Sequence, residues 1–210
     1  RQRQMCIRDR FRPVHCAVGP DGSIYVADFY DARITHVDPR DNWDRSNGRI
    51  HRIRTRASKT SKPPDLGELS SAQLVDKLLE KNQWARRHAR RLLRTRSAEP
   101  SLHELGRIVK EYNPDTDRSE QQALEALWIL QGTFLPKTNP SEMKEILLAA
   151  LGSSSPDLQR WAIRIAADQQ TPLGPALVEI ASASKHAEVI SQLASAARIL
   201  GDRSLIEALA

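Results

Sequence analysis

The sequence contains few cysteines and no long apolar run. Its 2 cysteines form neither a CxxC pair nor a CxxCH motif, so the chain carries no disulfide framework, zinc knuckle or covalent c-type haem motif of its own. No segment approaches the roughly 18 apolar residues of a membrane span, and the arginine-rich start lacks the apolar stretch of a secretory signal. With 210 residues and 40% hydrophobic content, the chain is long enough for one large or two small folded domains.

The net charge of +6 is divided unevenly along the chain. Residues 1–96 hold 22 Lys and Arg against 11 Asp and Glu, whereas residues 97–210 hold 10 against 15, so the two parts carry +11 and −5. A basic half is compatible with nucleic-acid binding. Its arginines are nevertheless spread over a tail, a strand-rich segment and one helix, which makes nucleic-acid binding the weaker alternative.

The first ten residues show neither a helical nor a strand period. They resemble translated sequencing-adaptor read-through, and we expect residues 1–10 to be an artefact or disordered. On this interpretation Cys6 has no function and the natural chain continues upstream.

Residues 11–56 follow a β pattern of four short strands. Strands are predicted at 14–18 and 23–27, joined by the turn Gly19-Pro20-Asp21-Gly22, whose Asp-Gly pair suits a tight reversal. Further strands are predicted at 34–37 and 48–53, the last from its alternation of polar and apolar residues. Four strands in about 40 residues match one blade of a β-propeller, and a propeller needs about four to eight blades. We therefore expect the tail of a larger propeller, followed by a proline-terminated polar linker at residues 57–69.

From Ser70 onward the apolar period becomes helical. Ser70 and Gln73 form a predicted capping box at the first helix. Further helices are predicted at 83–96, 99–112, 119–133, 140–152, 156–168, 172–183 and 187–200. Pro140 and Pro156, each after a cap residue, are placed at first helical turns, where a missing N–H is harmless.

These predicted helices form pairs of roughly 30 to 45 residues, the interval of HEAT and armadillo repeats. Small alanines at the centre of every second helix favour close stacking. The predicted fold class is thus an α+β multidomain fragment, with a propeller-blade remnant followed by a right-handed α-solenoid over residues 70–210. A last helix begins near Arg203 and stops, so we expect the chain to continue downstream as well.

Several segments together resemble one family, the bacterial membrane-bound dehydrogenases, over about residues 11–210. The resemblance is carried by the turn Gly19-Pro20-Asp21-Gly22, by Ala27-Asp28-Phe29-Tyr30-Asp31, by Arg40-Asp41-Asn42-Trp43-Asp44-Arg45, and by Asn47-Gly48-Arg49-Ile50. The repeat segment 84–93 fits the family's first repeat. The sequence departs at His15, where an acidic residue is usual, and at Phe29, where Trp is usual.

Proteins of that family join a sugar-dehydrogenase-like propeller to HEAT-like repeats and usually end in a cytochrome c module. The resemblance implies a periplasmic or cell-envelope protein that takes part in oxidising sugars or alcohols. It also implies PQQ, calcium and haem c in the whole protein, with no cofactor in this segment. Since propeller catalysis draws residues from several blades, we expect no turnover from these 210 residues alone.

Polar residues at or just past the second strand are the first candidate site. In a propeller this position faces the central funnel, where side chains contribute to a substrate or quinone pocket. The alternative is that Asp28 and Asp31 satisfy turn N–H groups and hold the blade in register. The funnel candidates are Asp28, Tyr30, Asp31, Arg33 and His36.

The loop at residues 38–48 offers several oxygen ligands for calcium. It lacks the terminal acidic residue of an EF-hand loop. Interleaved Arg40 and Arg45 favour internal salt bridges instead.

The helix at 83–96 carries the second candidate site, an arginine face opposite its apolar stripe. The arginines opposite the stripe are Arg86, Arg87, Arg90, Arg91 and Arg94, and the first four of them form the candidate interaction face. We expect this face to dock protein partners, above all propeller blades and downstream domains of the parent protein. The alternatives are a solvated ion-paired face and a phosphate-binding face, the latter disfavoured because no aromatic residues interleave with the arginines. A non-catalytic HEAT-repeat interaction module is the second functional hypothesis beside the dehydrogenase.

Overall fold

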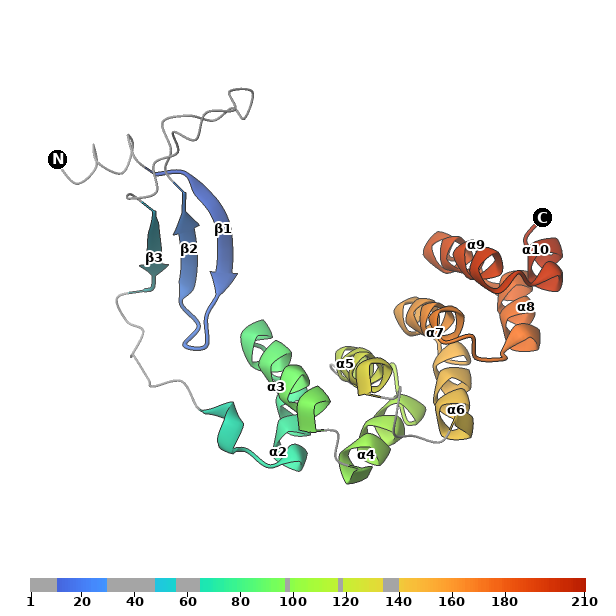
Figure 1. Ribbon diagram of the computed structural model, residues 1–210, viewed down its shortest axis with the longest axis horizontal. Coiled ribbons are helices and arrows are strands. Elements are labelled where there is room, and N and C mark those ends of the chain that lie inside the picture. The colour runs from blue at the N-terminus through green and yellow to red at the C-terminus, as the bar shows by residue number, and fades with distance from the viewer. Residues whose placement is uncertain (1–10, 30–47, 56–64, 97–98, 117–118, 134–139) are drawn as a thin grey trace. The chain divides into compact units, whose positions relative to one another are not determined.

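The computed structural model describes residues 11–29, 48–55, 65–96, 99–116, 119–133 and 140–210. The chain divides into two compact units, one formed by Arg1–Asp65 with Asn82–Trp84 and the other by Leu66–Lys81 with Ala85–Ala210. The strands belong to the first unit and most of the helical residues to the second (Figure 1).

The first unit contains a three-stranded antiparallel sheet in the order β1-β2-β3. The strands are β1 (Pro13–Val18), β2 (Ile24–Asp28) and β3 (Arg49–Ile53). At the β1–β2 turn Gly22 adopts φ +75, a conformation that glycine adopts without steric cost. Gly19 N donates to the carbonyl of Ser23 at 2.8 Å, which closes the predicted hairpin.

Strand register places one apolar residue from each strand on the same face. Val18 pairs with Ile24, and Ile24 pairs with Ile53, so the three side chains lie side by side. We call Val18, Ile24 and Ile53 the apolar patch of the sheet. β3 pairs directly with β2, while the predicted strand at 34–37 lies outside the described residues.

The described part of the chain then contains nine α-helices and two short 3-10 turns, η1 (Leu66–Glu68) and η2 (Lys77–Leu79). The helices are α2 (Ser71–Asp76), α3 (Gln83–Arg96), α4 (Glu99–Lys110), α5 (Ser119–Thr133), α6 (Pro140–Leu151), α7 (Pro156–Asp168), α8 (Gly174–Ala183), α9 (Ala187–Leu200) and α10 (Arg203–Ala208).

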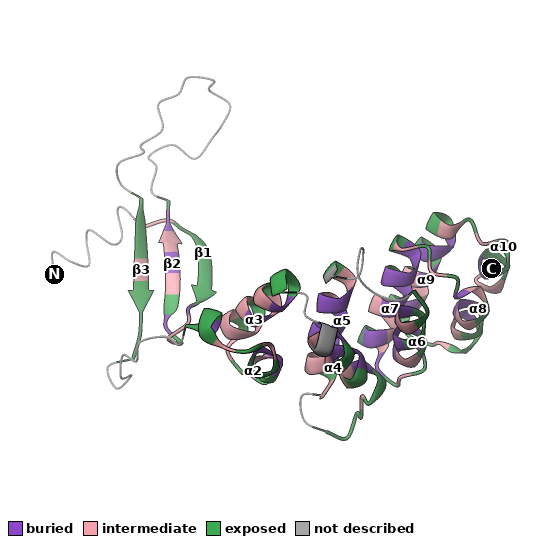
Figure 2. Ribbon diagram, turned by 60° about the horizontal axis from the view of Figure 1, so that its bottom comes forward, coloured by how far each residue is buried: buried purple, intermediate pink, exposed green. Residues whose placement is uncertain are grey.

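Successive helices pack in pairs, and the pairs stack into two layers. α4 packs against α5 and α6 against α7, while α5, α7 and α9 are neighbours in one layer and α2, α4 and α6 in the other (Figure 1). Buried residues line the surfaces between these helices (Figure 2). Leu105, Leu127, Ile146, Leu158 and Ile163 are among the fully buried side chains that form this core.

Local signals in the sequence explain where several helices begin and end. Ser70 and Gln73 form the capping box of α2, with N···O distances of 2.9 and 3.2 Å. Ser155 caps α7 ahead of Pro156. Gly201 ends α9 in the left-handed conformation at φ 64, a common helix stop.

The α+β class and the stacked helix pairs predicted from periodicity are confirmed. Several helix boundaries differ from the prediction. The first helix passes into the 3-10 turn η2 after Asp76, and α8 begins at Gly174, because Leu173 is its N-cap and Pro175 occupies its first turn. α4 ends at Lys110 rather than at residue 112, and α6 ends at Leu151 rather than at residue 152.

Candidate interaction site on the arginine-rich helix

Asp28, the one predicted funnel residue that the structure describes, is buried within the sheet unit. Its side chain is 1% exposed, its Oδ1 accepts a hydrogen bond from Arg12 N at 2.7 Å, and His51 Nε2 lies 3.4 Å from its Oδ2. These contacts tie the chain before β1 to β2 and β3. Tyr30, Asp31, Arg33 and His36 lie outside the described residues.

The apolar patch of the sheet is substantially exposed within the described structure. Val18 is 49%, Ile24 42% and Ile53 52% exposed. Only Val26 supplies a buried apolar side chain to the described sheet, and a small sheet needs a covered face for independent stability. The patch is therefore a surface suited to packing against another protein layer.

Helix α3 combines a narrow apolar stripe with a dense row of cations. Ala89 and Leu93 are its buried residues. Its sequence contains no Asp or Glu, so no carboxylate within the helix neutralises its arginines. The four candidates from the sequence divide into two pairs that differ in their surroundings.

Arg86 and Arg90 point to a buried carboxylate on α5. Arg90 Nη1 donates to Glu125 Oε2 at 2.8 Å, and Arg86 Nε lies 3.7 Å from Glu125 Oε1. Gln121 Nε2 donates to the same Oε1 at 3.1 Å, and Arg86 Nη1 donates to the carbonyls of Glu80 and Lys81. Glu125 thus holds two guanidinium groups in place between α3 and α5.

Two tryptophans extend this cluster across successive helices. Arg90 lies over the Trp128 ring, with its Cζ 5.1 Å from the ring centroid. Trp128 on α5 meets Trp161 on α7 edge to face at 5.4 Å, and Arg164 lies over Trp161 at 5.2 Å. Aromatic rings do therefore accompany the arginines, contrary to the sequence-based argument, because they come from other helices.

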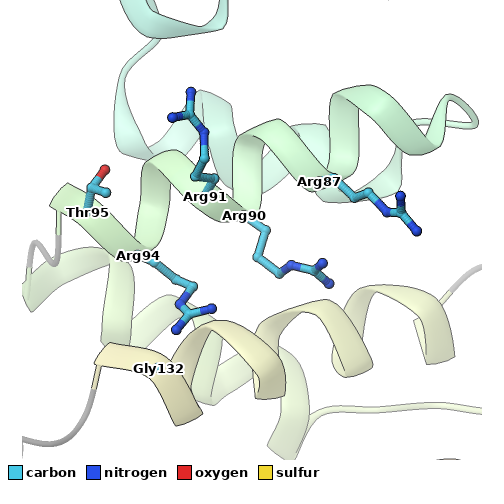
Figure 3. Close-up of a pocket in the computed structure, with 6 residues that line it drawn as sticks. All are labelled: Arg87, Arg90, Arg91, Arg94, Thr95 and Gly132. Atoms are coloured by element: carbon cyan, nitrogen blue, oxygen red, sulfur yellow. The ribbon is translucent and has the colours of Figure 1, made fainter. Parts of the chain in front are cut away.

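Arg87 and Arg91 form the second pair and are exposed. No described carboxylate pairs with either residue, and Arg91 Nη2 lies 3.2 Å from His88 Nε2. Both residues line a cavity of about 460 Å³ between α3 and α5. Figure 3 shows Arg87, Arg90 and Arg94 extending toward α5, while Arg91 extends away from it.

Gly132 on α5 completes this cavity, which we call the arginine pocket; its lining is Arg87, Arg90, Arg91, Arg94, Thr95 and Gly132. A Cβ at position 132 would lie 2.2 Å from Arg94 Nε and Nη2. This distance is shorter than any van der Waals contact. Any residue other than glycine at position 132 would therefore force the Arg94 guanidinium to move.

Two ion pairs outside this pocket, Asp21 with Arg52 and Glu104 with Arg107, have shifted pKa values. Desolvation opposes ionisation of Asp21, but hydrogen bonds from Ser23 and the charge of Arg52 lower the pKa of its carboxyl below 3.8. On α4, the hydrogen bond from Arg107 lowers the pKa of Glu104, and the pKa of Arg107 is raised in turn. Each pair joins residues of one unit.

Among the described residues no three His, Cys, Asp or Glu side chains gather as a metal site requires. Of the loop at residues 38–48, for which the sequence favours internal salt bridges over a calcium site, only Gly48 is described. None of the described helices has the length and apolar character needed to cross a bilayer.

Comparison with known proteins gives one match. A family model described as a domain of unknown function, DUF7133, matches residues 8–57. This segment contains the three strands of the sheet. No curated protein and no solved structure matches the chain.

Proposed function

We propose that this chain is a protein-interaction module. Its helical repeats use the arginines of α3 to bind a partner protein whose surface carries carboxylates. The observation that carries the proposal is the division of the α3 arginines. Glu125 engages Arg86 and Arg90, whereas Arg87 and Arg91 project from the same helix without a described carboxylate partner. The ion-paired Arg86 and Arg90 lie beside the exposed Arg87 and Arg91, and together they form a positively charged surface that is complementary to an acidic partner.

Contact rather than chemistry is supported by the histidines of the described structure. His51 lies beside Asp28 and His103 beside Glu142, and no described Ser or Cys side chain is hydrogen bonded to either imidazole. Nucleophilic catalysis needs a nucleophile, a base and an orienting group together. Stacked helix pairs, in contrast, offer the extended surfaces with which solenoid proteins bind.

We further propose that the sheet is one blade of a sugar-dehydrogenase-like propeller, in a periplasmic or envelope oxidoreductase acting on sugars or alcohols. The exposed apolar patch of Val18, Ile24 and Ile53 supports this architecture, because adjacent propeller blades bury such faces. The family resemblance supports the reaction class and the involvement of PQQ, calcium and haem c elsewhere in the whole protein. The remaining blades and downstream domains are the proposed partners of this chain.

Nucleic acid is the weaker alternative partner. Trp128 and Trp161 add aromatic rings to the arginine surface, but a guanidinium group already covers a face of each indole. The net charge of −5 over residues 97–210 also opposes a long polyanion along the repeats.

The experiment compares charge reversals in the longer protein that contains this chain. Arg87→Glu with Arg91→Glu should reduce lysine and carboxylate cross-links between the repeats and the propeller, and should speed proteolysis at residues 57–69. Lys144→Glu with Arg198→Glu is the matched control, because it makes the same charge change at two exposed residues of α6 and α9. Equal cross-linking in both variants, or tight sequence-selective DNA binding by the wild type, would reject the docking proposal.

A further inference from the structure

The arginine pocket brings three guanidinium groups from one helix toward the same neighbouring helix. Arg87, Arg90 and Arg94 lie on one side of α3, at the spacing of three and four residues that places side chains on one helix face. All three extend toward α5 (Figure 3). Their convergence around a cavity of about 460 Å³ creates a local excess of positive charge.

Arg90 is the fixed element of this pocket. Its guanidinium is bonded to the buried carboxylate of Glu125 and lies over Trp128. A group held on two sides loses little side-chain entropy when a ligand arrives. Arg90 is thus held in place by α5, and Arg87 and Arg94 lie on either side of it along α3 (Figure 3).

Gly132 determines whether the Arg94 guanidinium fits beside α5. Because a Cβ at position 132 would lie only 2.2 Å from the guanidinium nitrogens, even alanine would displace this group. A guanidinium has five N–H donors in a planar fork, so it can bind an incoming oxyanion in addition to existing partners. Because Gly132 has no side chain, the Arg94 guanidinium and its N–H donors can remain in the pocket.

The surrounding charges favour a short anionic ligand. The cationic row is confined to α3, whereas residues 97–210 carry an excess of five negative charges. A polyanion extended along the repeats would meet repulsion beyond the first pair. One or two side-chain carboxylates on a protein segment match both the size and the confinement of the pocket.

We infer that the arginine pocket is a carboxylate clamp that receives Asp or Glu side chains of an acidic peptide segment, with Arg87 and Arg94 as the binding residues. The inference rests on the proposed docking function and names the chemistry that the partner presents. Gly132 sets the position of Arg94, and Glu125 with Trp128 sets the position of Arg90.

The test uses the complete 210-residue chain and an acetylated hexaglutamate peptide, with binding measured by calorimetry at low salt. Gly132→Ala should weaken binding by about tenfold, the equivalent of one charge-assisted hydrogen bond, without changing any charge. Arg94→Lys should weaken it similarly, because lysine keeps the charge but lacks the fork. Since alanine favours helix more than glycine does, α5 is expected to fold in Gly132→Ala, and circular dichroism checks this.

Gly152→Ala is the matched control, because a Cβ at that position meets only ordinary contacts at 3.5 Å or more. Hexaglutamate binding that falls in Gly132→Ala and Arg94→Lys but not in Gly152→Ala supports the clamp. Equal affinity in all variants overturns it, as does tighter, Gly132-dependent binding of inorganic phosphate or a single-stranded oligonucleotide. Cross-links that respond to Arg87→Glu with Arg91→Glu, together with a Gly132→Ala variant of unchanged affinity, would keep the docking proposal and reject the clamp.

Discussion

Glu125 on α5 and Arg90 on α3 form a nearly buried ion pair, with 2.8 Å between Oε2 and Nη1. The carboxylate side chain is 4% exposed, while Arg90 is 26% and Arg86 17% exposed. A buried carboxylate of this kind must be paired, because an isolated charge in the protein interior is costly. Glu125 therefore connects the arginine helix to the rest of the repeat stack.

Glu125→Gln should destabilise the helical unit by about 1–3 kcal/mol, below the full cost of breaking a buried pair because the arginines keep contact with water. The amide retains the shape of the side chain but leaves two guanidinium groups without their counter-ion. Denaturant unfolding followed by circular dichroism measures the change. Glu145→Gln is the control, since Glu145 is 66% exposed beside Lys110, and its loss should cost about 0.5 kcal/mol or less. Equal losses in the two variants would contradict a special role for Glu125.

Periodicity was sufficient to predict the helices because their apolar residues recur at helical spacing and several helices have explicit caps. The predicted helices at 83–96, 119–133, 156–168 and 187–200 coincide with α3, α5, α7 and α9. Local signals specify such boundaries, since cap residues bond to backbone groups within the same turn. The passage of α2 into η2 was not predicted, because no proline or glycine marks it in the sequence.

The contacts of the candidate site were less predictable, because they join residues far apart in the chain. Arg90 and Glu125 are separated by 35 positions, and Trp128 and Trp161 meet only through helix stacking. Helical spacing places the four candidate arginines on one side of α3. Which of them are partly buried depends on α5, because Glu125 on α5 pairs with Arg86 and Arg90. A signal was present in Glu125 itself, an acidic residue within the otherwise apolar run at residues 123–130 of its helix.

Ser155→Ala should destabilise the helical unit by about 1–2 kcal/mol, the usual effect of losing an N-cap. The Ser155 hydroxyl accepts a hydrogen bond from Leu158 N at 3.1 Å and donates to Glu120 on α5. Ser155 is buried, whereas its neighbour Ser154 is exposed. Ser154→Ala is accordingly the control, with little expected change in the unfolding midpoint. A Ser155→Ala midpoint equal to that of Ser154→Ala would show that the cap contributes nothing.

The Asp21 carboxyl should titrate below its ordinary pKa of 3.8. A lowered pKa in the folded state stabilises the sheet unit at pH values above the ordinary pKa, and this contribution is lost as the pH falls through the folded value. Carbon-detected NMR of the side-chain carboxyl gives the midpoint. Arg52→Gln removes the charge that pairs with Asp21 and should move the midpoint upward. A wild-type midpoint at or above 3.8 would show that the Ser23 and Arg52 contacts do not stabilise the ionised form.

Ala162→Leu should destabilise the helical unit by about 1–3 kcal/mol, because a larger side chain overpacks a filled core. Ala162 on α7 is 0% exposed, and α7 is a direct neighbour of α5, α6 and α9. Alanine at this position allows close helix approach, so leucine would force the layers apart. Ala194→Leu on α9 is the matched control, since Ala194 is exposed and leucine there meets solvent. The denaturant midpoint should fall for Ala162→Leu and stay unchanged for Ala194→Leu. An unchanged midpoint in Ala162→Leu would mean that the space beside α7 can hold a leucine, and that the close packing of the helices does not depend on a small residue at position 162.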